Sequence, residues 1–438
     1  MSVEEYGVVS ITVAIGTLVS AAFGAPFVPL VVRSAAVDPG RKAQKDLSTV
    51  RAWMLWIAPT LTLAIGGAVW LTQLSIASVP PNVLTIEFIA VGVALHATYY
   101  VLPLFRGSER LRAFVLISSI SIVTLLVTKL LFVIILRSGP TGWVISDLIA
   151  ALIGLAASLL FRDLGSARPS LTGARSVFKF TGAVVLQSLM TWSTQNFSRP
   201  LMALLMPLSQ VGVFAASINA LAAATIVLFE FNKATVVEYS RSRSDRPSLK
   251  VHKASRVHRL LAFVAALAMI GLAPPFVAFA LPPEYSSATA VLVALAFGLF
   301  ALGLYDLPLN FLVYSEGKTG LAWVPSAIGA LALVAGALLL APSLGALGGG
   351  IAVAVSYATM AAGSWVTLLI AGARAPWRQL GISWRTLAAL LAGLAPAAAS
   401  VSLALPAAYQ IVSLAWGVAC GMAVGFADRK YYKKQDMR

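Results

Sequence analysis

Charged residues, histidine and cysteine are all scarce in this sequence. Asp, Glu, Lys and Arg make up 11% of the 438 residues, and there are three His and a single Cys. One cysteine excludes an internal disulfide and a cysteine-based zinc site. The sequence also lacks an ATP-binding motif, a cluster of metal ligands and the spacing of a nucleophile with its base. We therefore expect no cofactor, no metal site and no enzymatic centre.

Hydrophobic residues are abundant instead, at 59% of the chain with a mean hydropathy of +0.88. A soluble protein of this length could not bury so much apolar surface, so the sequence predicts an all-α polytopic membrane protein. Thirteen apolar segments are each near the roughly 20 residues needed to cross a bilayer. They cover residues 6–32, 53–73, 84–105, 112–136, 142–161, 178–206, 210–232, 259–281, 287–313, 320–341, 347–370, 385–404 and 409–427.

The net charge of +16 could suggest a nucleic-acid partner, but the positions of the basic residues argue against one. Lys and Arg concentrate in alternate loops, with clusters at 41–51 and 233–259 and in the tail at 429–438, whereas the other loops hold little besides Arg137. This is the positive-inside pattern of membrane proteins. It predicts an N-terminus outside and a C-terminus in the cytoplasm, with anionic lipid head groups as a secondary partner of the basic loops.

An internal repeat is visible around two similar pentapeptides. Tyr-Val-Leu-Pro-Leu at 100–104 recurs as Tyr-Asp-Leu-Pro-Leu at 305–309, an offset of 205 residues (305 minus 100). The same offset aligns the surrounding apolar segments. Because six segments separate the copies, both have the same orientation, as in two-bundle transporters built from parallel repeats.

The repeat predicts the domain organisation. We expect an N-terminal bundle at 1–161, a cytoplasmic linker at 162–177, a C-terminal bundle at 178–370, and two extra helices with a basic tail at 371–438. The segment 178–206 opens the second copy and has no counterpart in the first. The sequence thus predicts a fourteen-helix plan whose first helix is missing, leaving about 13 helices.

Two stretches carry a resemblance to a known family. The segment EEYGVVSITVAIGTLVSAAFG at 4–24 resembles the second-helix region of bacterial polysaccharide exporters, and QNFSRPLMALLMPLSQVGVFAAS at 195–217 resembles their seventh-to-eighth helix junction. In the second stretch the family often has N-x-D-[RK] and a V-G-x-Y/F turn. Asn196, Arg199, Val211, Gly212 and Phe214 match this pattern, whereas Ser198 stands where the family often has Asp.

The resemblance implies a fold, a cargo and a location. These exporters are oligosaccharide flippases of the multidrug/oligosaccharidyl-lipid/polysaccharide (MOP) flippase superfamily. The implied fold is a V-shaped pair of bundles that works by alternating access in the bacterial cytoplasmic (inner) membrane. The implied cargo is a polyprenyl-diphosphate-linked oligosaccharide for surface polysaccharide synthesis, with a polymerase or glycosyltransferases as further partners. The superfamily also contains multidrug exporters, so cargo does not follow from fold.

The residues expected to contact such a cargo lie in the stretch 187–209. An arginine at membrane depth is costly unless it faces a cavity or a partner, and Arg199 could grip phosphate oxygens in a bidentate way. Gln195 and Asn196 could bind sugar hydroxyls. A structural ion pair for Arg199, and interhelical hydrogen bonds for the two amides, are the alternatives.

Four further charged residues are weaker candidates. Lys129 lies within an apolar segment and either faces a cavity or extends to the outer interface. Arg33 lies at a cytoplasmic helix end and could contact cargo. Glu230 and Lys233 are three residues apart and could form a stabilising pair on one helix face.

Asp306 and His96 are candidates for binding a coupling proton or sodium ion. A carboxylate inside an apolar segment could hold a cation, or could pair with a cation on a neighbouring helix. A single histidine in a helix is either a proton relay or part of a structural hydrogen bond. We expect Glu87, near the outer end of its helix, to be solvated.

Three functions compete at this point. A lipid-linked oligosaccharide flippase is favoured by Arg199 and Lys129. A cation-coupled multidrug exporter would use a more acidic cavity. A membrane glycan polymerase or ligase would need a sizeable outer loop, whereas the outer loops in this sequence are short, the longest being about 73–83.

Overall fold

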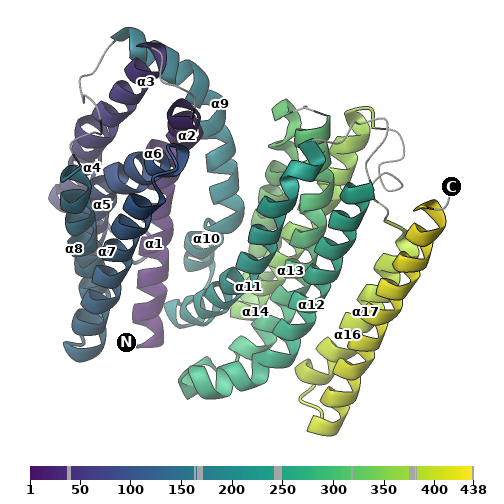
Figure 1. The fold of residues 1–438 in the computed structure, drawn as a ribbon. Helices are drawn as coiled ribbons and strands as arrows, with labels where there is room; N and C mark the ends of the chain where they lie inside the picture. Colours follow the sequence, from purple (N-terminus) through teal and green to yellow (C-terminus); the bar gives the residue numbers. More distant parts are fainter. Residues whose placement is uncertain are drawn as a thin grey trace. The chain divides into compact units, whose positions relative to one another are not determined.

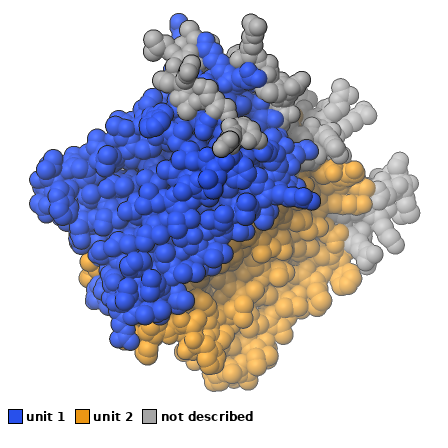
Figure 2. Space-filling model, turned by 60° about the vertical axis from the view of Figure 1, so that its left-hand side comes forward, with its two compact units in different colours: residues 1–204 blue, residues 205–438 orange. Residues whose placement is uncertain are grey.

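The computed structural model describes residues 1–36, 41–161, 164, 171–240, 249–316, 319–373, 380 and 382–436. These residues form helices and connecting loops, and no β-strand occurs among them. The chain divides into two compact units, Met1–Leu204 and Leu205–Arg438, drawn in blue and orange in Figure 2. Each unit is a helical bundle.

Unit 1 is organised around α5, which packs against α1, α4 and α8 (Figure 1). Serine and glutamate begin α1 with a reciprocal capping box, in which Ser2 and Glu5 each accept a hydrogen bond from the other's backbone N–H. The helices of this unit are α1 (Val3–Phe23), α2 (Val28–Ala36), α3 (Arg41–Ala52), α4 (Ala58–Thr72), α5 (Pro81–Leu95), α6 (Leu102–Gly107), α7 (Leu111–Lys129), α8 (Gly139–Leu159), α9 (Leu171–Gln195) and α10 (Ser198–Leu205).

Unit 2 is organised in the same way around α13, which packs against α11, α12 and α14. The two C-terminal helices α16 and α17 pack against each other and against α12. The helices of this unit are α11 (Leu208–Ser240), α12 (Leu249–Ala280), α13 (Ala288–Asn310), α14 (Val324–Ile370), α16 (Trp384–Ser402) and α17 (Ala407–Asp436).

The predicted polytopic fold is confirmed. Among the described residues, 11 helices are long and apolar enough to cross a membrane, and each overlaps one or two of the predicted segments. Burial differs strongly between them: 56% of the most apolar window is buried in the helix at 81–107, against 11% in the helix at 111–135. The outward-facing residues of α7 include Val123 and Leu126, as expected of a surface in contact with lipid tails.

A kink at Gly345 divides α14 into the two segments predicted at 320–341 and 347–370. Gly345 has φ +55° and ψ −132°, a conformation that residues with a side chain rarely adopt. The helix that follows is capped from another part of the unit, because the Gln210 side chain accepts a hydrogen bond of 3.1 Å from the Ala346 N–H. The long α14 is therefore two helices joined at a glycine corner.

A second break divides the predicted segment 178–206 into α9 and α10. Pro200 has no N–H, and in a continuous helix its ring would clash with the carbonyl of Asn196, four residues earlier. That carbonyl instead accepts a hydrogen bond of 3.3 Å from the Arg199 N–H. One long helix is thus replaced by two shorter ones, with the polar residues of the segment at the break.

The internal repeat is confirmed by the helix boundaries. At an offset of 205, Val3, Pro81 and Gly139 correspond to positions 208, 286 and 344. Helices of unit 2 begin at Leu208 and Ala288, and the second part of α14 follows Gly345. The two compact units divide the chain after Leu204, so they group α9 and α10 with unit 1. The repeat instead predicts that 178–206 opens the C-terminal bundle, and this domain boundary stays a prediction.

Candidate functional site

The break between α9 and α10 brings together two of the predicted cargo-binding residues. Arg199 is 7% exposed, and its Nη1 donates a hydrogen bond of 3.2 Å to Asn196 Oδ1. This bond fixes the Asn196 amide and the guanidinium relative to each other, and Arg199 has further interactions within the protein. The structure thus places Arg199 and Asn196 side by side, while their role in binding cargo stays a prediction.

A cavity of about 520 Å³ lies in unit 1 next to this break, and we call it the polar cavity. Six of its lining residues carry a hydroxyl, amide, indole or phenol group, and no charged side chain is among the described residues that line it. Its lining is Thr17, Ser20, Ala21, Ala25, Val28, Pro29, Tyr99, Val184, Ser188, Trp192 and Asn196.

The indole of Trp192 connects α9 to α1 at this cavity. Its Nε1 donates to the Ala14 carbonyl at 3.0 Å and approaches Thr17 Oγ1 at 3.1 Å. Since both contacts use the indole N–H, what Trp192 has left for a ligand is the face of its ring. An aromatic face beside hydroxyl and amide groups suits a molecule with both apolar C–H and polar O–H groups.

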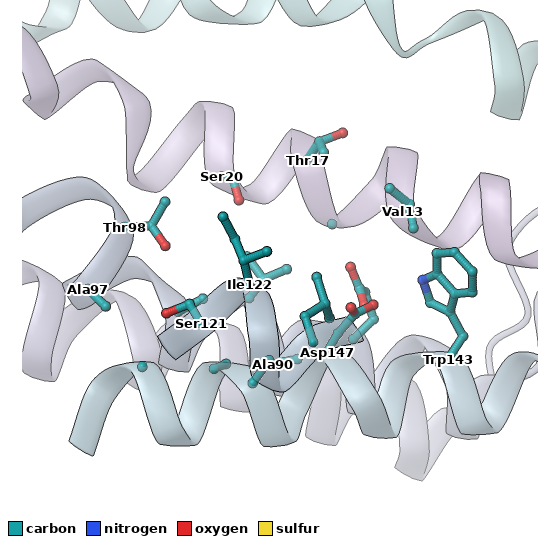
Figure 3. Close-up of a pocket in the computed structure, with 18 of the residues that line it drawn as sticks. Val13, Thr17, Ser20, Ala90, Ala97, Thr98, Ser121, Ile122, Trp143 and Asp147 are labelled. Atoms are coloured by element: carbon teal, nitrogen blue, oxygen red, sulfur yellow. The ribbon is translucent and has the colours of Figure 1, made fainter. Parts of the chain in front are cut away.

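A second cavity of unit 1, of about 390 Å³, contains charged residues, and we call it the ionic cavity. Figure 3 shows the Asp147 carboxylate and the Trp143 indole extending from α8 toward α1. The remaining lining comes from α1, α5, α7 and the turn after α5. It consists of Val13, Gly16, Thr17, Ser20, Glu87, Ala90, Val91, Ala94, Ala97, Thr98, Ser121, Ile122, Leu125, Lys129, Trp143, Asp147, Ala150, Ala151 and Gly154.

Lys129 lines the ionic cavity, which is one of the two positions that the sequence left open for it. Its Nζ lies 3.0 Å from Asp147 Oδ1 and 3.6 Å from the centre of the Trp143 ring. The ammonium therefore has both a carboxylate and an aromatic face as partners. Asp147 and Trp143 were not singled out in the sequence. A signal was available, because Lys129 and Asp147 are equally far from Ser138, at the short turn that makes α7 and α8 antiparallel neighbours.

The expectation that the Glu87 side chain is solvated is wrong. The side chain is 6% exposed and lines the ionic cavity, because its helix α5 is the central helix of the bundle. A Cβ at position 16 would lie 2.0 Å from Glu87 Oε1, so only glycine at that position of α1 leaves room for the carboxylate. Position near a helix end did not predict exposure, because neighbouring helices cover that end.

His96 is buried at the end of α5. Its Nδ1 lies 3.1 Å from Ser158 Oγ, and its ring stacks on Tyr100 with 5.6 Å between ring centres. These contacts match the structural reading of His96 that the sequence analysis left open. A role in binding a coupling ion stays a prediction.

In unit 2, Asp306 lies opposite His258. Asp306 is 5% exposed, and its Oδ2 is 3.6 Å from His258 Nε2. A partner on a neighbouring helix was one of the two alternatives expected for Asp306. His258 itself was not singled out in the sequence. The pair joins α12 to α13 in the interior of the unit.

The remaining predicted residues are only partly described. Glu230 is exposed on α11. The side chains of Gln195 in α9, Arg33 in α2 and Lys233 in α11 lie outside the described part of the structure. Their predicted roles, and the predicted pairing of Glu230 with Lys233, therefore stay predictions.

Comparison with known proteins places this geometry in a family. A family model described as polysaccharide biosynthesis protein matches residues 1–290. No curated protein gives a sequence match. The fold is shared with solved transporters at low sequence identity.

Three of these solved structures are a flippase and two transporters. The structure titled lipid II flippase MurJ, in an inward closed conformation, has a TM-score of 0.70 and 13% identity, covering 100% of this chain and 94% of the other. An inward-facing multidrug resistance transporter of the MATE family has a TM-score of 0.70 and 12% identity, covering 85% and 91%. A MOP superfamily transporter from Pyrococcus furiosus has a TM-score of 0.55 and 15% identity, covering 86% and 86%.

The family match includes the helices that build both cavities of unit 1, and the structural matches extend over the rest of the chain. This multi-pass membrane protein therefore belongs to the polysaccharide biosynthesis protein family and has the fold of the MOP flippase superfamily.

Proposed function

We propose that the protein is a flippase that moves a polyprenyl-diphosphate-linked oligosaccharide across the bacterial cytoplasmic membrane by alternating access, for synthesis of a surface polysaccharide. Family membership supports a task in polysaccharide biosynthesis. The observation that carries the transport of a glycan is the polar cavity, where neutral hydroxyl, amide and aromatic groups line a space inside a membrane bundle.

The chemistry of the cargo fits this lining. A glycan that crosses the membrane must exchange hydrogen bonds with water for hydrogen bonds with the protein. Ser188 and Asn196 offer donors and acceptors, and Trp192 and Tyr99 offer ring faces for the C–H face of a sugar. The diphosphate needs a cation, which Arg199 supplies beside Asn196. Membrane lipids would hold the polyprenyl tail outside the bundle.

A multidrug exporter of the same superfamily is the second candidate. It is favoured by the two carboxylates Glu87 and Asp147 in the ionic cavity, since carboxylates could bind a cationic drug. The ion pair of Asp147 with Lys129 weakens this alternative, because one of the two carboxylates already has a cationic partner. A coupling ion, proton or sodium, would serve either function.

Deletion of the gene tests the proposal. The deletion strain should accumulate lipid-linked repeat units on the cytoplasmic face and lose surface polymer, and the wild-type gene should restore the polymer. Arg199→Ala should fail to restore it at normal protein level, because the diphosphate loses its cation. Arg199→Lys, which keeps the charge but not the bidentate geometry, should restore it in part.

Two further variants examine the glycan contacts. Asn196→Ala and Trp192→Leu should each slow the flipping of lipid-linked repeat units, whereas Thr60→Ala, at an exposed position of α4 outside the polar cavity, serves as a control. An unchanged surface polymer in the deletion strain, together with sensitivity to cationic drugs, would reject the flippase and favour the drug exporter.

A further inference from the structure

A groove of about 410 Å³ lies in unit 2 between α12 and α17, which run side by side (Figure 1), and we call it the α12–α17 groove. Its walls are apolar, with Val264 on α12 and Met422 and Phe426 on α17 among the lining residues. Each of these three side chains is more than half exposed, so the groove opens at the surface of the unit. Arg256, at one end, is the only charged residue among the described residues that line it.

Glycines of α17 bring the two helices close together along this groove. Gly417, Gly421 and Gly425 are four residues apart and share one face of the helix. A Cβ at position 421 would lie 2.8 Å from the Phe263 ring. A Cβ at position 417 would lie 2.8 Å from the end of the Leu267 side chain. The groove therefore results from close helix packing, with larger side chains of α17 standing beside the glycine face.

The length of the groove corresponds to one leaflet of a bilayer. Its α12 wall extends from Arg256 to Leu267, which is 11 residues (267 minus 256), or about 16 Å at the rise of an α-helix. Half of a hydrocarbon core is about 15 Å thick. The apolar segment predicted at 259–281 begins just after Arg256, so Arg256 lies at the level of the lipid head groups. An acyl chain of one leaflet would extend from there along the apolar walls.

The head-group end of the groove is positively charged. Arg256 Nη2 donates a hydrogen bond to the Gly425 carbonyl, which holds the guanidinium at the groove, and Arg256 has further interactions within the protein. Lys253 is exposed three residues earlier, on the same face of α12. Residues 249–260 include two Lys, two Arg and two His but no Asp or Glu. A phosphate at this end of the groove would meet the positive charges of Arg256 and Lys253.

We propose that the α12–α17 groove binds one anionic phospholipid of the cytoplasmic leaflet, with its phosphate at Arg256 and Lys253 and an acyl chain along the apolar walls. The predicted orientation places this end of α12 in the cytoplasm, where anionic lipids attract basic residues. A lipid with a net negative charge is favoured over a zwitterionic one, because the ammonium group of the latter would be repelled by the same two cations. The inference concerns a membrane lipid and does not depend on which cargo the protein moves.

Native mass spectrometry of the purified full-length protein tests the proposal, with phosphatidylglycerol and phosphatidylethanolamine of identical acyl chains as probes. The wild type should retain one phosphatidylglycerol at concentrations at which phosphatidylethanolamine is lost. Arg256→Gln should weaken the binding of phosphatidylglycerol about tenfold, because it removes a charge at the phosphate while the new amide can still donate to Gly425. Val264→Trp should weaken binding by a similar factor, because the indole fills the groove at an exposed position.

Two matched variants separate loss of the site from a general change in the protein. Arg112→Gln, at an exposed position of α7, and Val366→Trp, at an exposed position of α14, make the same chemical changes outside the groove. Neither should alter the retention of phosphatidylglycerol. If Arg256→Gln does not fold, Val264→Trp still decides, because its side chain points out of the bundle.

Three results would overturn the proposal. The first is equal retention of the two phospholipids by the wild type, and the second is unchanged binding of phosphatidylglycerol by Val264→Trp. The third is stronger binding of inorganic phosphate or of undecaprenyl phosphate than of phosphatidylglycerol. That result would assign the groove to a free anion or to the tail of a polyprenyl-linked cargo.

Discussion

The two units have the same helical plan but differ in where the central helix carries its buried carboxylate. In unit 1, Glu87 lies in the middle of α5, whereas in unit 2, Asp306 lies near the end of α13. At the offset of 205 residues, Glu87, Lys129, Trp143 and Asp147 correspond to Leu292, Val334, Gly348 and Ala352. The scaffold was thus kept while the ionic groups were placed differently in each copy.

The pairs of corresponding residues also show how each polar group is accommodated. Gly16 leaves room for Glu87, and its counterpart in unit 2 is Leu221, which is buried with Leu292 in an apolar interior. Likewise, His258 and Asp306 correspond to Trp53 and Val101 of unit 1. In each unit, a buried polar residue is accompanied by a neighbour that makes space for it or pairs with it. The lesson is that buried charges in this protein belong to sets of residues contributed by several helices.

The largest effect is expected from placing a carboxylate at the apolar position of unit 2 that corresponds to Glu87. Leu292 is 2% exposed, so Leu292→Glu should destabilise the protein by about 4 kcal/mol, because no cation lies at the position equivalent to Lys129. Unfolding in increasing concentrations of SDS measures the change. Leu292→Met, which conserves volume, should cost less than about 1.5 kcal/mol. A stable Leu292→Glu protein would show that the unit 2 interior already supplies a partner.

Removing the cation from unit 1 should have the next largest effect. Lys129→Ala leaves Asp147 without its cation, and we expect a loss of about 3 kcal/mol in the free energy of unfolding. Combining it with Asp147→Ala should recover part of this loss, because the second variant removes the unpaired charge. Val334→Ala, the matched change in unit 2, should cost about 1 kcal/mol by loss of apolar contact alone. Additive effects of Lys129→Ala and Asp147→Ala would contradict the ion pair.

Filling the space beside Glu87 tests why unit 1 has Gly16 at the position where unit 2 has Leu221. Gly16→Ala should cost about 2 kcal/mol, because its Cβ would lie 2.0 Å from Glu87 Oε1 and the carboxylate must move. The cost should largely vanish in a Glu87→Ala background, and thermal unfolding of the four proteins measures this coupling. Gly67→Ala serves as the control, since a Cβ there meets no atom within 4 Å.

The smallest expected effect concerns His96. Ser158→Ala removes the partner of His96 Nδ1 and should cost about 1 kcal/mol, the usual value of one buried hydrogen bond. Ala301 of unit 2 corresponds to His96, so unit 2 has no equivalent hydrogen bond to lose. The free energy of unfolding of Ser158→Ala checks the value. A cost of several kcal/mol would show that His96 has a larger part in the bundle than one hydrogen bond.

Most of the fold could be predicted, and the candidate site only in part. Each span depends on the local hydropathy of about 20 residues, so the helices were located from neighbouring residues alone. Arg199 and Asn196 were found together because two residues three positions apart at a turn stay close whatever the tertiary structure. Glu87 was misjudged, because its burial depends on α1 and α8, which are distant in the chain. Asp147 was missed for the same reason, despite its symmetric position about the turn between α7 and α8.

The amino-acid sequence was enough to predict a polytopic membrane protein with two parallel repeats, and it indicated the family. Hydropathy, segment length and an internal offset are properties of the chain that need no packing. Which polar residues meet depends instead on how the helices pack. Trp192 contacts Ala14 and Thr17, which lie 178 and 175 residues earlier in the chain. Glu87, Lys129 and Asp147 come together from three helices. The energy of a buried polar group depends on its partners, and partners from separate helices are set by packing.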